Sequence, residues 1–194
     1  MRMIEFFLHG YGSSAGEFRL HWGPNVSAQN SFFLDGPQFD RLTSKRRWFP
    51  FSAQPAVVQR GLGIAVGAAE RQIEVMLQSI GHGITTEIAL VGHSQGAMVV
   101  YEVLHRQRFN VSAARCYAGF LPRSQFRPIR AARSSISLSI YSSTIDLYID
   151  PLEVKYTVLY FRKIPGIDVT HYQTSQLTHG FSSGWLDSRK FEIQ

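Results

Sequence analysis

Cysteine is nearly missing from this sequence, because Cys116 is the only one among 194 residues. A disulfide within the chain is therefore excluded, and so is a zinc site built on several thiolates. The neighbouring residues 115–118 are typical of a buried strand, so we interpret the thiol as a packed side chain and not as a nucleophile. A chain without disulfides suits a reducing compartment, and we expect a cytoplasmic protein.

Long apolar runs are missing too. No run reaches the roughly 18–20 residues that a membrane-spanning helix requires. The first apolar stretch ends at His9 and Gly10 without an Ala-x-Ala-like cleavage site, so we interpret residues 3–9 as a first strand and not as a signal peptide. Internal repeats, low-complexity tracts and an interdomain linker are also lacking, and the length suits one domain over residues 1–194.

Acidic residues are in the minority, with 14 against 20 lysines and arginines, which gives a net charge of +6. The basic residues gather at Lys45–Arg47 and at Arg123, Arg127, Arg130 and Arg133. They form either a solvated surface or a surface that attracts anionic substrates, lipid head groups or nucleic acid. Neither cluster belongs to a recognisable nucleic-acid-binding module, so we expect no nucleic-acid partner and leave transient contact with anionic lipid open.

The apolar pattern alternates between strand-like and helix-like segments. Short apolar runs typical of strands occupy residues 3–9, 31–35, 87–91, 113–119, 135–142 and 167–172. Helices are predicted over residues 55–80, directly after residue 96, over 150–163 and over 183–193. Strands that alternate with helices predict an α/β fold with a mostly parallel central sheet and helices on both faces.

One short motif, Gly92-His93-Ser94-Gln95-Gly96, matches the pattern G-x-S-x-G. A strand-like run precedes it and an amphipathic helix follows it, as a nucleophile elbow requires. Such a turn lifts the serine hydroxyl above the sheet edge, and glycine is needed on both sides because a Cβ would collide with the neighbouring strand and helix. We predict Ser94 as a nucleophile; a plain turn with a capping serine is the simpler alternative.

A serine nucleophile requires a general base, and the base requires an acid that orients it. After a nucleophile elbow, the acid and then the histidine follow the serine along the chain. His179 lies in a polar loop that contains glycine, whereas His171 lies within a predicted strand, so we predict His179 as the base. Asp146 follows the end of a strand, whereas Asp150 precedes a proline and fits a helix cap, so we predict Asp146 as the acid.

The tetrahedral intermediate of such a reaction requires two backbone donors for its oxyanion. The N–H of Gln95, directly after the nucleophile, is the first that we predict. The second is expected from the loop after the first strand, where we choose the N–H of Tyr11. This chemistry requires no metal and no cofactor, and we expect none.

Six short segments, spread in order over nearly the whole chain, resemble one known family. They are Leu8–Ser13, Trp48–Phe49, Gly92–Ala97, Ala118–Pro122, Asp146–Ile149 and His179–Gly180. Together they resemble the phospholipase/carboxylesterase family of α/β-hydrolases, which includes acyl-protein thioesterases. The resemblance implies a minimal α/β-hydrolase fold without a lid domain. It also implies an acyl-enzyme on Ser94, with a small-molecule carboxylic ester, thioester or lysophospholipid as substrate.

The sequence departs from that family at several places, among them Pro50 after the Trp-Phe pair and Asp150 after the acid turn. His93 stands where phenylalanine is more usual, and the acid turn at 142–146 lacks the glycine that usually precedes the acid. The unusual acid turn and the positive charge motivate a second hypothesis. In this hypothesis the chain is a catalytically inactive binding protein on a hydrolase scaffold, with a basic partner-binding surface.

Overall fold

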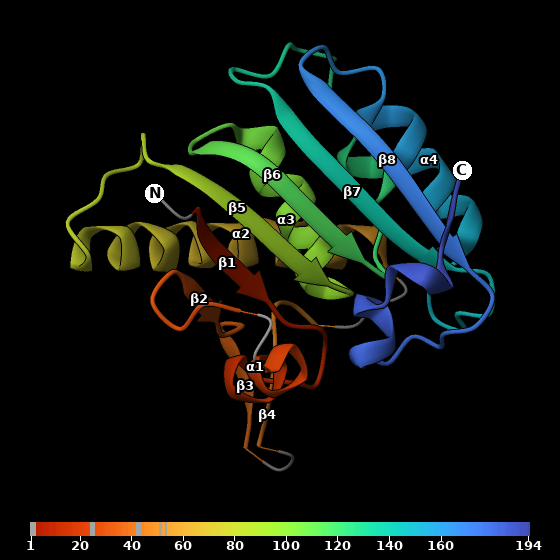
Figure 1. The fold of residues 1–194 in the computed structure, drawn as a ribbon, viewed down its shortest axis with the longest axis horizontal. Coiled ribbons are helices and arrows are strands. Elements are labelled where there is room, and N and C mark those ends of the chain that lie inside the picture. The colour runs from red at the N-terminus through yellow and green to blue at the C-terminus, as the bar shows by residue number, and fades with distance from the viewer. Residues whose placement is uncertain (1–2, 24–25, 42–43, 51, 53) are drawn as a thin grey trace.

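The computed structural model describes residues 3–23, 26–41, 44–50, 52 and 54–194 (Figure 1). A sheet with the strand order β2-β1-β5-β6-β7-β8-β9 forms its centre. The strands are β1 (Ile4–Leu8), β2 (Ser31–Leu34), β5 (Glu87–His93), β6 (Asn110–Tyr117), β7 (Ile136–Ser143), β8 (Ile167–Thr174) and β9 (Glu192–Ile193). Neighbouring strands pair in parallel, except that β9 runs antiparallel to β8.

Helices cover both faces of this sheet, but unequally. The α-helices are α1 (Ala15–Trp22), α2 (Pro55–Ser79), α3 (Gln95–Arg106) and α4 (Pro151–Phe161). The three longest, α2, α3 and α4, lie together behind the sheet in Figure 1. The predicted α/β fold with a mostly parallel sheet is therefore confirmed. Within the described ranges, no helix is both long enough and apolar enough to span a bilayer.

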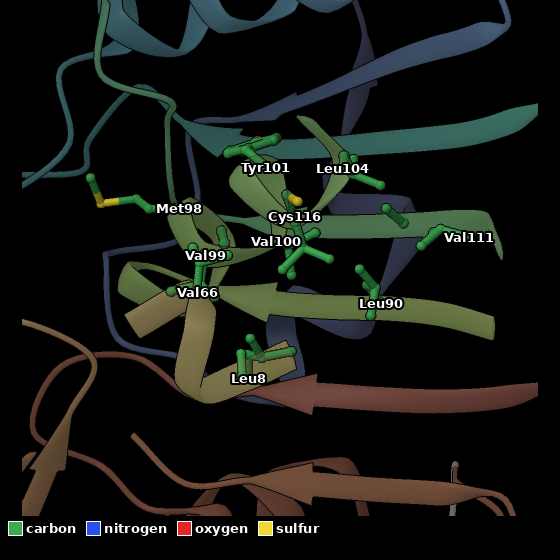
Figure 2. Close-up of a cluster of buried hydrophobic side chains, with 14 of the residues drawn as sticks. Leu8, Val66, Leu90, Met98, Val99, Val100, Tyr101, Leu104, Val111 and Cys116 are labelled. Atoms are coloured by element: carbon green, nitrogen blue, oxygen red, sulfur yellow. The ribbon is translucent and has the colours of Figure 1, made fainter. Parts of the chain in front are cut away.

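The apolar alternation of the strands divides the interior into two cores, because successive side chains of a strand point to opposite faces. Phe6 and Leu8 of β1 belong to the larger core, which α2, α3 and α4 cover. Figure 2 shows part of this core, in which Cys116 of β6 lies among apolar side chains. Burial raises the pKa of the Cys116 thiol, so the cysteine is a packed neutral side chain.

The opposite face carries a smaller, aromatic core. Phe7, which lies between Phe6 and Leu8 in sequence, packs here with Phe18 and Trp22 of α1. Trp185, from the 3₁₀ turn η3 (Ser183–Leu186), closes the same core near the C-terminus. This aromatic layer places α1 and the C-terminal segment on the same face of the sheet.

The predicted helix over residues 183–193 is wrong. This segment consists of η3, a second 3₁₀ turn η4 (Ser188–Lys190) and β9. The Asp187 carboxylate accepts a hydrogen bond from the N–H of Arg189, and this local bond competes with a continuous helix. The edge of β8 then offers backbone partners to Glu192 and Ile193, an option that side-chain spacing does not reveal.

The segment between β1 and α2 contains more structure than the sequence pattern indicated. Helix α1 begins at Ala15, with Ser14 as its N-cap, where no helix was predicted. Strands β3 (Gln38–Asp40) and β4 (Lys45–Arg47) form a small antiparallel hairpin. The first basic cluster, Lys45–Arg47, therefore lies on a hairpin strand beside the loop that follows β1. Outside this segment, a further 3₁₀ turn, η2 (Arg123–Gln125), follows β6.

Candidate active site

Ser94 lies at the sharp turn between β5 and α3, as its motif predicted. Its backbone has φ 53° and ψ −117°, a strained conformation for a residue with a side chain. A Cβ on Gly92 would lie 2.6 Å from the backbone of Gly96, and a Cβ on Gly96 would lie 2.1 Å from the carbonyl oxygen of Leu8. Both glycines are therefore required for the close approach of β5, α3 and β1 at this turn.

Three side chains that are far apart in sequence form one line of hydrogen bonds at this edge of the sheet. The Nε2 atom of His179 lies 2.9 Å from the Ser94 hydroxyl oxygen. The Nδ1 atom of the same ring lies 2.8 Å from a carboxylate oxygen of Asp146. Because an ionised carboxylate only accepts, Nδ1 carries the proton and Nε2 presents its lone pair to the Ser94 hydroxyl.

The Asp146 carboxylate is held in its ionised form. Partial burial works against the charge, but hydrogen bonds from His179 and from the backbone N–H groups of Tyr148 and Ile149 outweigh it and lower the pKa of Asp146. The two backbone donors bind the oxygen that does not face His179. The runner-up acid, Asp150, instead caps α4 by accepting from the N–H of Leu152.

The loops that carry the acid and the histidine are tied together. The Ser143 hydroxyl, at the end of β7, donates to the carbonyl oxygen of Leu177 at 2.5 Å and accepts from the N–H of Ile145 at 3.2 Å. His171, the rejected base, is packed within β8, where its Nε2 lies 2.8 Å from the Ser142 hydroxyl. The structure therefore brings Asp146 and His179 to Ser94 and leaves His171 inside the fold.

His93, directly before Ser94, supports the histidine loop. Its Nε2 lies 2.9 Å from the backbone carbonyl oxygen of His179, so this nitrogen carries a proton and donates. Burial, with a smaller contribution from the charge of His179, lowers the pKa of His93 to about 3, which keeps the ring neutral near pH 7. Phe181 packs against the same ring, with the two centroids 5.1 Å apart.

Replacing His93 by phenylalanine is expected to lower kcat for an ester substrate about 10-fold with little change in KM. Phenylalanine retains a ring but leaves the carbonyl oxygen of His179 without its donor, which frees the histidine loop to move. His93→Gln retains an N–H donor and is expected to recover part of the lost kcat. A steady-state comparison of the three proteins checks this; equal kcat values in all three would contradict it.

The buried neutral His93 also predicts how stability depends on pH. Between about pH 6.5 and about pH 3 the unfolded chain protonates this residue and the folded protein does not, so stability falls as the pH falls below 6.5. When the pH falls from 7 to 5, His93 is expected to lower the free energy of unfolding by about 2 kcal/mol. Urea unfolding at both values should therefore show a smaller loss for His93→Phe than for the parent. Burial also lowers the pKa of His171, to about 4. His171 therefore causes a further loss of stability at low pH, and this loss is the same in the parent and in His93→Phe.

The loop after β1 lies against the nucleophile. A Cβ on Gly10 would lie 3.3 Å from the Cβ of Ser94 and 2.7 Å from Nδ1 of His93, so only glycine allows this approach. His9 is fully buried; its Nδ1 donates to the carbonyl oxygen of Gly10, and its Nε2 accepts from the N–H of Gly36. Burial lowers the pKa of His9, in agreement with a neutral ring in this position.

Gln95 has a structural task that the motif alone did not indicate. Its side-chain oxygen accepts from the N–H of Trp48 at 3.1 Å, and its amide nitrogen donates to the carbonyl oxygen of Phe49 at 2.9 Å. The indole N–H of Trp48 donates to the carbonyl oxygen of His9. The buried pair Trp48–Phe49 thus connects the elbow to the loop after β1 through hydrogen bonds. The roles of the Tyr11 and Gln95 N–H groups as oxyanion donors stay predictions.

No protein-family model and no curated protein matches this sequence. Among solved structures, it is similar to esterase PE8, with 19% identity, a TM-score of 0.79 and coverage of 97% of this chain and 89% of the other. It is also similar to the Bacillus cereus carboxylesterase, with 16% identity, a TM-score of 0.77 and coverage of 97% and 86%. The chain has the α/β-hydrolase fold.

The same fold occurs in a phospholipase/carboxylesterase from Dyadobacter fermentans, with 17% identity, a TM-score of 0.72 and coverage of 94% of this chain and 85% of that one. The resemblance in sequence motifs therefore extends to the fold of this group. Within the α/β-hydrolase fold, the supporting contacts of His93 and of the Gln95 side chain were missed by sequence reasoning. The available signal was the histidine at a position where the family usually has phenylalanine.

Proposed function

We propose that this α/β-hydrolase is a serine hydrolase that cleaves carboxylic esters through an acyl-enzyme on Ser94. The observation that carries the proposal is the continuous contact from Asp146 through His179 to the Ser94 hydroxyl. A serine hydroxyl is a weak nucleophile until a base removes its proton, and this arrangement supplies a base with the correct nitrogen unprotonated. The esterases and carboxylesterases of the same fold support the substrate class.

In the acylation step, the Ser94 oxygen forms a bond to the substrate carbonyl carbon while Nε2 of His179 takes the hydroxyl proton. The carbonyl oxygen becomes an oxyanion, for which we assign the backbone N–H groups of Gln95 and Tyr11 as donors. Two features support this assignment: Gln95 is the first residue of α3, and Gly10, next to Tyr11, lies against Ser94.

Collapse of the tetrahedral intermediate breaks the bond to the leaving group, which takes the proton from His179. Water then attacks the acyl-enzyme, with His179 as base again, and releases the acid and free Ser94. Asp146 remains ionised throughout and stabilises the imidazolium that forms in both steps. Within this mechanism an alcohol and a thiol are both competent leaving groups, so thioesters and lysophospholipids belong to the proposed substrate range.

A fluorophosphonate probe tests the proposal against the inactive binding protein. An activated Ser94 displaces fluoride and forms an oxygen–phosphorus bond, whereas an unactivated serine does not react on the same timescale. We expect labelling of one residue, Ser94, identified by peptide mass spectrometry, and no labelling of the Ser94→Ala variant or of the heat-unfolded protein. A folded protein that stays unlabelled would favour the binding-protein hypothesis.

A further inference from the structure

A concave site lies at the end of α3 that is farther from Ser94. A cleft of about 510 Å³ is bounded by the end of α3 at 104–107, the segment 127–133 and the region from Tyr160 in α4 to Ile167 at the start of β8. Ser94 precedes the first residue of α3, so this 12-residue helix separates the cleft from the elbow by about 18 Å. The cleft therefore belongs to the amino-terminal edge of the strands, opposite the proposed active site.

Arginine dominates the wall of this cleft. Arg106, Arg127, Arg130 and Arg133 all line it. Arg127 and Arg106 pair with Glu102, whose side chain is only 2% exposed, and Arg106 also pairs with Glu70. Arg130 and Arg133 are exposed and form no ion pair with any residue that the structure describes. These two guanidinium groups supply positive charge that no carboxylate of the described residues neutralises through an ion pair.

Hydrogen bonds hold the segment 127–133, which carries Arg130 and Arg133, against the end of α3 and against α4 and the residues that follow it. The Tyr160 hydroxyl accepts from the N–H of Arg127 and donates to its carbonyl oxygen, both at 3.1 Å. The side-chain amide of Gln107 donates to the carbonyl oxygen of Ala131 at 3.2 Å, and the N–H of Ala132 donates to the carbonyl oxygen of Pro165 at 2.8 Å. The backbone beneath Arg130 is therefore preorganised, which lowers the entropic cost of binding a ligand there.

One buried polar atom in the same wall lacks a partner. The Nδ1 atom of His105 lies 3.2 Å from a carboxylate oxygen of Glu102 and so donates to it, which leaves Nε2 as an acceptor. Nε2 is buried and has no hydrogen-bond partner among the described residues. The His105 side chain is 5% exposed, and buried acceptors of this kind are normally satisfied. His105, which lines the cleft, therefore contributes an acceptor that the described residues leave unsatisfied.

We propose that this cleft binds a small ligand through a phosphate group with two or more negative charges. Guanidinium groups match phosphate oxygens bidentately, and the arginines here outnumber the carboxylates that they contact. A volume of about 510 Å³ is typical of small-molecule sites, which favours such a ligand over a flat macromolecular partner. The shared chemistry, a phosphate anion, is found both in free phosphorylated compounds and in the head group of phosphatidate.

The test uses the whole protein and inorganic pyrophosphate as the probe, by isothermal titration calorimetry at constant low ionic strength, since salt screens such contacts. The double variant Arg130→Gln/Arg133→Gln is expected to weaken binding about 10-fold or more. The matched control is Arg19→Gln/Arg60→Gln, which removes the same charge from exposed positions that do not line the cleft. The control is expected to change the affinity less than twofold.

A second arm separates the sources of the phosphate. Sedimentation with vesicles of phosphatidylcholine, with and without phosphatidate, is measured for the same three proteins. Binding of pyrophosphate that depends on Arg130 and Arg133 supports a free ligand, and binding to phosphatidate vesicles alone with the same dependence supports a lipid head group. Absence of both, or equal binding by the two double variants, overturns the proposal. Neither readout uses Ser94, so the outcome is separate from that of the hydrolase proposal.

Discussion

Ser94→Ala is expected to lower kcat for p-nitrophenyl acetate by about 10⁴-fold or more. The activity that remains would come from substrate binding and the oxyanion donors alone. Alanine cannot form the acyl-enzyme, and no other hydroxyl contacts Nε2 of His179 among the described residues. Release of p-nitrophenolate, followed by absorbance, measures the effect. The far-ultraviolet circular dichroism spectrum is expected to remain unchanged, because an alanine side chain keeps the Cβ that the elbow already accommodates.

Ser137→Ala is the matched control for this experiment. Ser137 is an exposed serine of β7, away from the elbow, and its substitution should leave kcat within about twofold. Full activity in Ser94→Ala would remove the acyl-enzyme mechanism. Equal losses in both variants would instead indicate damage to the fold.

The second large effect is expected for Asp146→Asn. Two backbone N–H groups, of Tyr148 and Ile149, bind one oxygen of the carboxylate, so the oxygen of an asparagine would take that position. Its NH₂ group would then face Nδ1 of His179, which would have to accept. The imidazole proton would move to Nε2, and the ring could no longer receive the proton of Ser94.

We therefore expect Asp146→Asn to lower kcat roughly 10³–10⁴-fold while substrate binding changes little. Asp150→Asn is the control, because asparagine caps a helix about as well as aspartate and the carboxylate contacts Leu152, not His179. Activity measured across pH 6–9 distinguishes the two variants. A large loss in Asp150→Asn with normal activity in Asp146→Asn would reverse the assignment of the acid.

Much of the fold could be predicted because the apolar periods are strong. The run at 87–91 and the helical spacing over 55–80 correspond to β5 and α2, which have these patterns because both are packed in the interior. The C-terminal segment could not be predicted in the same way. Trp185 and Phe191 pack in the aromatic core, and residues 192–193 pair with β8, so partners far away in the sequence decide the conformation of this segment.

The supporting contacts of the candidate site could not be predicted either. The hydrogen bond of His93 spans 86 positions to His179, and the Gln95 amide joins backbone atoms that lie 46 and 47 positions earlier. Each contact depends on the distance between two loops, which no local pattern records. The resemblance to a family marked His93 as a departure, because phenylalanine is usual there, but it did not indicate which group the imidazole would contact.

The amino-acid sequence by itself determined the strand–helix order, the elbow around Ser94 and the chemical types of the three side chains. These features depend on local preferences: apolar period, glycine where a Cβ has no room, and the order of polar loops. Only the tertiary structure decided that Asp146 and His179 meet the Ser94 hydroxyl, and that Arg130 and Arg133 border a cleft at the opposite edge. Such contacts form because parallel strands bring their ends to common edges, so packing of the whole chain sets the distances.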